Sequence, residues 1–354
     1  MNDLLALTAE LVDIPSVSHD EQAITDRIET DLRGAPWLTV DRLGDNVVAR
    51  TSLDRPTRVV IAGHTDTVPV NDNDRARIEG DTLWGLGASD MKSGLAVMLE
   101  LATTIDAPAV DVTYVFYAGE EIAAEHNGLG HVMRDRPDLL RGDVAILGEP
   151  TGAVLEAGCQ GTLRLDVCLT GVRAHSARPW MGRNAIHRLG RLLAIIDEWE
   201  GRRPVVDGCE YREAVQAVLV EGGVAGNVVP DRARVVINHR FAPDRDEAGA
   251  EAWLRELIAP ALEEGDTAEM VDSAAGARPG LDHPLFAALI ARNDLEVRAK
   301  LGWTDVARFT ALSMPAVNLG PGDPLLAHTA DERVTRDQLD RTWSILRDLL
   351  VSGS

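Results

Sequence analysis

The chain of 354 residues carries a formal net charge of −22, and 45% of its residues are hydrophobic although only 4% are aromatic. This length allows one large or two medium domains, whose cores are built mainly from aliphatic side chains. The charge argues against nucleic acid as a partner, because a phosphate backbone is bound by clustered Lys and Arg. The sequence contains no run of 18 apolar residues, so it predicts no span through a membrane.

The first part of the chain alternates between helical and strand patterns. Helices are expected where apolar residues recur at helical spacing, at 3–13, 20–33 and 92–105. Strands are expected where short apolar runs are unbroken, at 58–63, 111–119 and 143–148. Such strands separated by helices favour an α/β fold, with a mostly parallel, mixed sheet that helices cover on both faces.

The middle of the chain follows a different pattern. One-sided strands, in which apolar residues alternate with others, are expected at 161–171, 214–223 and 232–243. Long helical stretches lie between them, at 183–200 and 246–262. The order strand, helix, two strands, helix, strand predicts a second, α+β domain of ordinary size.

The end of the chain returns to the α/β pattern. A helix is expected at 304–313, a buried strand at 314–320 and an amphipathic final helix at 335–350. The α+β domain is therefore predicted to be inserted into a discontinuous first domain. The expected boundaries are 1–160 and 280–354 for the first domain, and 161–279 for the inserted one.

Chemically active side chains are expected at one edge of the first domain's sheet. In parallel α/β sheets, ligands bind beyond the carboxyl ends of the strands. The polar residues that follow the expected strands, or precede the helix at 92–105, are His64, Asp66, Asp90, Glu120, Glu121, Glu149 and His328. Each of them alone has an ordinary structural explanation, such as a helix N-cap, so their shared location carries the argument.

Five of these residues have the side chains that bind divalent metal ions. Imidazole and carboxylate are ligands for Zn²⁺ and similar ions, and a catalytic zinc needs only three. Two ions about 3.5–4 Å apart would use all five if one carboxylate bridges them. Without metal, the carboxylates would repel one another at close range. The sequence therefore predicts a two-metal site formed by His64, Asp90, Glu121, Glu149 and His328.

The two adjacent glutamates are expected to have separate tasks. Adjacent residues at a strand end point in different directions, so Glu121 can bind metal while Glu120 faces a water molecule as general base. Metal coordination lowers the pKa of such a water to roughly 7. Asp66 is expected to orient the His64 ring through its second nitrogen.

Five motifs resemble the two-metal aminoacylase and carboxypeptidase family of metallopeptidases. They occur in the family's order over nearly the whole chain, as GHTDTVP, GLGASDMKSG, YAGEE, LGEPT and AHTADE. The resemblance implies a hydrolase of linear amides with two metal ions per subunit. By this resemblance, His64, Asp90 and Glu149 bind one ion, and Asp90, Glu121 and His328 bind the other. Zinc is the expected metal, and cobalt and manganese accept similar ligands.

The same resemblance assigns further roles at this site. It implies that Glu120 is the base, that Asp66 supports His64, and that Asp90 bridges the two ions. It also implies a cis peptide bond between Asp90 and Met91, which is costly for a non-proline residue and is held at functional sites.

The inserted domain resembles the family's lid and dimerisation domain. His175, in GVRAHSARPWMGRNAI, matches the histidine that stabilises the tetrahedral oxyanion, which in dimeric members reaches the partner subunit's site. Asn227, in GGVAGNVVPD, matches a lid residue that contacts substrate. The resemblance thus implies a homodimer formed through the lid domain.

The substrate implied by the resemblance is a small anionic N-acyl amino acid. A chain of net charge −22 must supply local cations to hold it, and arginine suits bidentate binding of carboxylates. Of Arg178, Arg183, Arg240 and Arg308, we favour Arg178 and Arg240, which flank the matched histidine and follow a lid strand. Thr304 is a further candidate for binding a substrate carboxylate. Surface ion pairing is the alternative for each arginine.

Two alternatives stay open for the function. Another deacylase or a dipeptidase of the same family would share most of the metal motifs. A catalytically inactive binding protein would be favoured by loss of the base, but Glu120 is present. Three cysteines without CxxC spacing, and no secretory signal before the first expected helix, indicate a cytoplasmic location.

Overall fold

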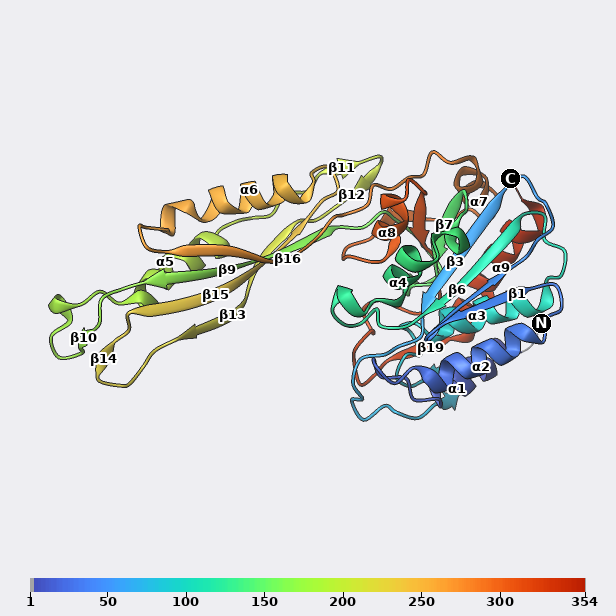
Figure 1. The fold of residues 1–354 in the computed structure, drawn as a ribbon, viewed down its shortest axis with the longest axis horizontal. Coiled ribbons are helices and arrows are strands. Elements are labelled where there is room, and N and C mark those ends of the chain that lie inside the picture. The colour runs from blue at the N-terminus through green and yellow to red at the C-terminus, as the bar shows by residue number, and fades with distance from the viewer. Residues whose placement is uncertain (1–2, 354) are drawn as a thin grey trace. The chain divides into compact units, whose positions relative to one another are not determined.

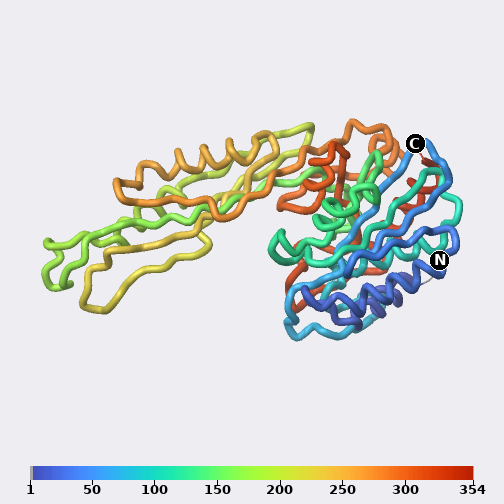
Figure 2. Tube along the Cα trace, in the orientation of Figure 1, coloured from blue at the N-terminus to red at the C-terminus, as the bar shows by residue number. Residues whose placement is uncertain are grey.

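The computed structural model describes residues 3–353, and contacts between residues divide them into two units (Figure 1). The first unit holds the residues up to Ala157, Pro279–Arg298, and the residues from Arg308 onward. The second unit holds Gly158–Arg278 and Ala299–Ala307. Figure 2 traces the chain out of the first unit in green and back into it in orange.

The expected domain boundaries placed the segment Ala299–Ala307 in the first domain, but in the structure it groups with the second unit. The reason is that its backbone and side chains form hydrogen bonds with residues of the second unit. The backbone N–H of Gln160 donates to Gly302 O at 2.9 Å, and the Trp303 indole donates to Ala275 O at 3.1 Å.

The first unit is built on an eight-stranded sheet with the strand order β1-β2-β6-β3-β7-β18-β8-β17. The strands are β1 (Thr39–Leu43), β2 (Asn46–Arg50), β3 (Arg58–His64), β6 (Asp111–Tyr117), β7 (Val144–Leu147), β8 (Leu155–Ala157), β17 (Val297–Ala299) and β18 (Ala316–Asn318). A second, three-stranded sheet contains β4 (Arg77–Glu79), β5 (Thr82–Trp84) and β19 (Arg333–Thr335).

The central strands of the large sheet are parallel and almost completely buried. β3 pairs in parallel with β6 and with β7, and β7 pairs in parallel with β18. Antiparallel pairing is found toward the edges, where β2 joins β6 and β8 joins β18. Every residue of β6 and β7 is buried, as expected for parallel strands with both faces covered.

Helices cover this sheet. They are α1 (Leu4–Val12), α2 (Gln22–Arg33), α3 (Lys92–Thr104), α4 (Gly128–Asp135), α7 (Pro284–Asn293), α8 (Val306–Ala311) and α9 (Arg336–Ser352), with 3-10 turns at η1 (Ala124–His126) and η2 (Pro137–Leu140). α1, α2 and α9 all pack on α3, whereas α4 packs separately on β2 and β6. α3 is therefore buried on nearly all sides, in agreement with its apolar sequence. The predicted α/β fold, with a mixed sheet flanked by helices, is confirmed.

The second unit is a four-stranded antiparallel sheet with two helices packed on it. The sheet has the order β13-β15-β9-β16. Its elements are β9 (Gly161–Thr170), α5 (Ala185–Asp197), β13 (Ala214–Gly222), β15 (Arg232–Phe241), α6 (Glu247–Ile258) and β16 (Thr267–Ala274). Smaller pieces are β10 (Ala174–His175), η3 (Pro179–Met181), β11 (Val205–Val206), β12 (Cys209–Glu210), β14 (Val228–Val229) and η4 (Ala259–Ala261).

The core of the second unit lies between the sheet and the two helices. Alternate residues of β9, from Leu163 to Leu169, are fully buried and pack with Leu192 of α5 and Leu254 of α6. This alternation is what the sequence predicted for strands with one covered face. Among residues 3–353, no helix combines the length and hydropathy that crossing a membrane requires.

Candidate metal centre and active site

His64 ends β3 with its imidazole buried among acceptors. Its side chain is 1% exposed. Nδ1 donates to the backbone carbonyl of Asp66 at 3.0 Å, and the Asp66 carboxylate lies 3.5 Å from the same nitrogen. In the neutral ring, Nε2 then carries a lone pair, and this nitrogen lies 3.1 Å from Oδ1 of Asp90. A lone pair facing a carboxylate oxygen requires a cation between them, either a proton or a metal ion.

Asp66 joins three segments behind His64. Its fully buried carboxylate accepts hydrogen bonds from the Ser18 hydroxyl at 2.7 Å and from the backbone N–H groups of Glu120 and Glu121 at 3.0 and 3.1 Å. Burial opposes the charged form, but His64, Ser18 and the Glu120 N–H outweigh it and lower the pKa of Asp66 to about 2. A permanent anion therefore fixes the ends of β3 and β6 relative to each other.

His328 faces the same group of carboxylates from the return segment after β18. Its Nε2 lies 2.9 Å from Oε1 of Glu121 and 3.6 Å from Oδ2 of Asp90. The residue has a positive φ of 62°, which is uncommon for a side chain other than glycine and is found at functional sites. The hydrogen bond to Glu121 raises the pKa of His328 to about 9, against the opposite effect of burial.

Four of the five predicted ligands therefore come together. Ligand atoms of His64, Asp90 and Glu121 all lie within 4.8 Å of one another, and His328 contacts two of these residues. The predicted cis peptide is also found, between Asp90 and Met91.

The fifth predicted ligand, Glu149, lies at the same edge of the sheet. In the parallel ladder of β3 and β7, Ala62 pairs with Leu147, so two residues later His64 and Glu149 leave the sheet side by side. Glu149 is 5% exposed. The register thus places its backbone beside the cluster, and its role as a ligand stays a prediction.

The donor set fits a pair of divalent cations. Hydrogen bonds to Asp66 and Asp90 outweigh burial and hold the pKa of His64 well above its usual range, as Glu121 does for His328. The site therefore favours positive charge at both imidazoles. Divalent ions would supply that charge and displace the protons, because a ligating histidine is neutral.

His175 and Asn227, both from the second unit, are neighbours in the structure. β10 pairs with β14 so that His175 lies opposite Val228, and the N–H of Ser176 donates to Asn227 O at 2.9 Å. The N–H of Ala177 donates to Nδ1 of His175 at 3.0 Å. The proton of the neutral ring is therefore on Nε2, which makes this atom a hydrogen-bond donor.

The remaining predicted substrate contacts lie at separate places in the second unit. Arg178 is exposed, and its N–H donates to the His175 carbonyl at 2.8 Å. Arg240 lies near the end of β15, opposite Thr162 of β9, and burial together with Arg164 lowers the pKa of its guanidinium. Thr304 is buried. The roles of these three residues stay predictions.

The comparison with protein families decides the membership of the chain. A model described as Peptidase family M20/M25/M40 matches residues 60–352. The chain belongs to this peptidase family. It is an M20 hydrolase, in agreement with the resemblance drawn from its five motifs.

Curated relatives of this M20 hydrolase match it over the whole length. A Mycobacterium tuberculosis (strain H37Rv) protein named as a succinyl-diaminopimelate desuccinylase is 52% identical over 98% of both chains. The succinyl-diaminopimelate desuccinylase of Corynebacterium glutamicum is 44% identical over 99% of this chain and 96% of its own.

Solved structures share the fold of this M20 hydrolase at low sequence identity. A tripeptidase from Staphylococcus aureus has a TM-score of 0.81 at 21% identity, covering 98% of this chain and 97% of its own. The YXEP protein of Bacillus subtilis, a dinuclear metal-binding peptidase of the M20 family, has a TM-score of 0.73 at 17% identity, covering 99% and 97%.

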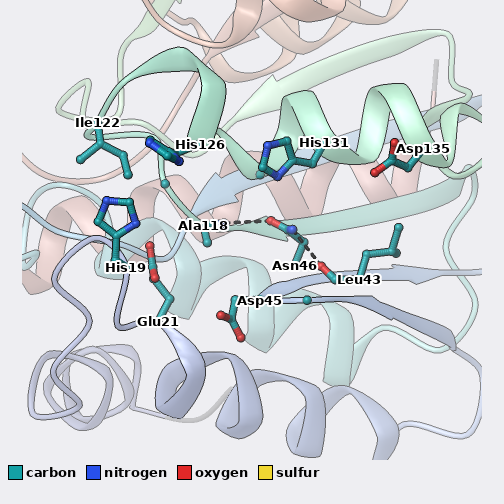
Figure 3. A pocket seen from close by; sticks show the side chains of 13 residues that line it. His19, Glu21, Leu43, Asp45, Asn46, Ala118, Ile122, His126, His131 and Asp135 are labelled. Carbon is teal, nitrogen blue, oxygen red and sulfur yellow. Dashed lines mark hydrogen bonds between the residues drawn. The ribbon is translucent and has the colours of Figure 1, made fainter.

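A cavity of about 560 Å³ lies beside the segment that carries the two adjacent glutamates of the M20 hydrolase (Figure 3). Ala118, Gly119 and Ile122 of that segment line it, together with three histidines that match no ligand motif, namely His19, His126 and His131. The rings of His19 and His126 meet edge to face with centroids 5.0 Å apart. The described lining includes none of the five predicted ligands, although Gly119 and Ile122 flank the two adjacent glutamates in the chain.

Two residues of this M20 hydrolase that support the metal centre were not identified from the sequence. Ser18 bonds to Asp66 from a segment to which no role was assigned from the sequence. Glu332 belongs to the matched motif AHTADE but received no role, and its carboxylate accepts the Asp90 N–H at 2.9 Å. Both bonds join residues far apart in the sequence, so no local pattern predicts them.

Proposed function

We propose that the chain is a succinyl-diaminopimelate desuccinylase. It would hydrolyse N-succinyl-LL-2,6-diaminopimelate to succinate and LL-2,6-diaminopimelate in the cytoplasm, a step of lysine and diaminopimelate biosynthesis. The observation that carries the proposal is the pair of imidazole nitrogens facing carboxylate oxygens, His64 toward Asp90 and His328 toward Glu121. The two full-length relatives at 52% and 44% identity support the choice of substrate.

Two divalent ions would be held by the five predicted ligands. His64, Asp90 and Glu149 would hold one, and Asp90, Glu121 and His328 the other. Imidazole and carboxylate favour zinc, with cobalt as an alternative. When bound, such ions polarise a carbonyl and lower the pKa of water.

Glu120 is the proposed general base. Its backbone N–H donates to Asp66 at 3.0 Å, which ties the segment after β6 that carries its carboxylate to the end of β3. The carboxylate takes a proton from water as the water oxygen attacks the succinyl amide carbon. It then passes this proton to the leaving amine, which leaves as diaminopimelate while the acyl group leaves as succinate.

Residues of the second unit would bind the substrate and stabilise the developing charge. Nε2–H of His175 is a suitable donor to the oxyanion of the tetrahedral intermediate, and Asn227, its neighbour, would contact the substrate. The substrate carries about −2 charge at neutral pH by ordinary pKa values. Arg178, Arg240 and Thr304 are proposed to bind its carboxylates.

We also propose that two copies form a homodimer through the second unit. The edge strand β13 exposes three apolar residues, Val218, Leu219 and Val220, by 57%, 40% and 54%. An exposed apolar edge strand is a template for pairing with another chain. Pairing of two β13 strands would cover these side chains and continue the sheet across both subunits.

A panel of substrates tests the proposed reaction against its alternatives. The zinc-loaded protein is offered succinyl-diaminopimelate, N-acetylornithine, other N-acyl amino acids and dipeptides at equal concentrations. The proposal expects the highest kcat/KM for the succinylated substrate. Preference for N-acetylornithine or a dipeptide would assign another activity of the same family, and no hydrolysis of any amide would favour an inactive binding protein.

A further inference from the structure

Glu332 holds the loop that carries Asp90. Its side chain accepts three backbone hydrogen bonds, from Ser89 and Asp90 to Oε1 at 2.9 Å each and from Gly87 to Oε2 at 3.1 Å. Glu332 is 1% exposed. A buried carboxylate is costly unless it is fully hydrogen-bonded, and here the backbone of the Asp90 loop supplies the donors.

The same loop is fastened to the segment that carries His328. The N–H of Gly85 donates to the Glu332 carbonyl at 3.1 Å, and the Ser89 hydroxyl donates to Asp323 O at 3.0 Å. A Cβ on Gly322 would lie 2.3 Å from the Ser89 hydroxyl oxygen, so glycine permits this close approach. Glu332 therefore joins the segments that supply Asp90, the predicted bridging ligand, and His328.

The bonds to Glu332 constrain the backbone that leads up to Asp90. They hold the N–H groups of Gly87, Ser89 and Asp90 against one side chain, and so limit where the Asp90 side chain can start. This constraint favours metal binding at Asp90 and does not require Glu332 to touch a metal ion.

We propose that Glu332 is a positioning residue for the metal pair, which sets the geometry of Asp90 relative to His328 through the Gly85–Asp90 loop. This inference rests on the proposed function, because it assumes that the site holds two ions. Glu332 is not one of the five predicted ligands, and the proposal gives it the separate task of positioning one of them. Groups that orient metal ligands typically contribute 10–100-fold to metal affinity or activity.

The test compares two buried carboxylates that hold backbone loops. Glu332→Gln keeps the size of the side chain but removes the charge and turns an N–H₂ group toward a backbone donor. Asp111→Asn makes the same change at the opposite, amino end of β6. There Asp111, 4% exposed, accepts the N–H groups of Leu53 and Arg55 and the Thr51 hydroxyl. Both variants are expected to lose stability, so stability alone does not discriminate between them.

Metal affinity is measured by titrating each apo protein with Zn²⁺ in competition with a chromophoric chelator, and kinetics follow on the zinc-loaded enzymes. We expect about 10–100-fold weaker binding of at least one ion by Glu332→Gln, with lower kcat and nearly unchanged KM. Asp111→Asn is expected to bind both ions as the wild type does. Equal weakening in both variants, or wild-type affinity in Glu332→Gln, would overturn the proposal.

A second variant covers the case in which Glu332→Gln does not fold. Glu332→Asp keeps the carboxylate but shortens the side chain by one methylene. Weakened zinc binding is again the expected result, and wild-type zinc affinity would overturn the proposal. The wild-type titration distinguishes a failure of the positioning role from a failure of the proposed function. Two bound ions with no effect at Glu332 refute only the positioning role, whereas a wild type that binds no pair of ions refutes the proposed function.

Discussion

At the residue scale, the site is defined by two imidazole nitrogens that face carboxylate oxygens at 3.1 and 2.9 Å. Glu120 stands next to one of these carboxylates in the sequence, but its task is a different one. Asp66 holds the backbone N–H groups of both adjacent glutamates, so the two side chains start from one tethered segment after β6 and can serve two functions.

Replacing Glu120 by glutamine is expected to abolish most turnover while metal binding is retained. The change removes the proposed base without changing the size of the side chain, and loss of a general base typically costs 10²–10⁴-fold in kcat. The measurement is kcat together with the zinc content of the same preparation. Glu125→Gln, at a side chain 78% exposed nearby, is the matched control. Near-wild-type turnover in Glu120→Gln would remove Glu120 from the mechanism.

Replacing His175 by alanine is expected to lower kcat by about 10²–10³-fold, the usual effect of removing one oxyanion donor. KM should change little, because the donor acts on charge that develops in the transition state. His187→Ala, at another exposed histidine of the second unit, should leave both constants unchanged. An equal loss in the two variants would show that the effect does not come from the oxyanion.

At the element scale, the two edges of the second unit's sheet are not equivalent. β13 exposes three large apolar side chains in a row, whereas β16 exposes Val271. Val218→Lys on β13 is expected to convert the proposed dimer to monomer, because a lysine on an edge strand opposes pairing. Val271→Lys is the control, since these valines are 57% and 55% exposed. Light scattering gives the mass, and dissociation by Val271→Lys alone would contradict the assignment of β13.

The helices and sheet of the second unit enclose a histidine whose protonation opposes folding. His239 is fully buried and its ring contacts Trp199 and Trp253, and burial lowers its pKa to about 4 from the ordinary histidine value of 6.5. The unfolded chain therefore binds the proton more tightly. The stability due to the neutral ring is complete above pH 6.5 and is lost as pH falls from 6.5 toward 4.

The free energy of unfolding should therefore differ measurably between neutral and acidic solution. Between pH 7.5 and pH 5, His239 should remove about 2 kcal/mol from the free energy of unfolding. Urea unfolding of the wild type and of His239→Phe at the two pH values isolates the contribution, because phenylalanine does not titrate. An equal pH dependence in the two proteins would contradict it.

At the scale of the whole molecule, the location of the site could be predicted because parallel strands align their carboxyl ends. The pairing of Ala62 with Leu147 in β3 and β7 places His64 and Glu149 side by side, and unbroken apolar runs are enough to identify these strands. Helices α1, α2 and α3 begin and end within about two residues of the expected ranges for the same reason, since each has a long apolar face.

Other parts of the fold could not be predicted from local patterns. β1 and β2 were not expected, because β1 is polar and partly exposed and gains its place through β2, which pairs with β6 more than 60 residues away. Ser18 and Glu332 likewise support the metal centre through bonds across 48 and 242 residues. Such contacts depend on tertiary packing, which hydrophobic periodicity does not encode.

The central claim is that five side chains from distant parts of the chain hold two divalent cations. Anomalous diffraction at the zinc absorption edge, from crystals of the zinc-loaded protein, tests it most directly. We expect two anomalous peaks about 3.5–4 Å apart, with Asp90 between them, His64 and Glu149 at one peak, and Glu121 and His328 at the other. A single peak, or zinc bound only away from these five residues, would contradict the account.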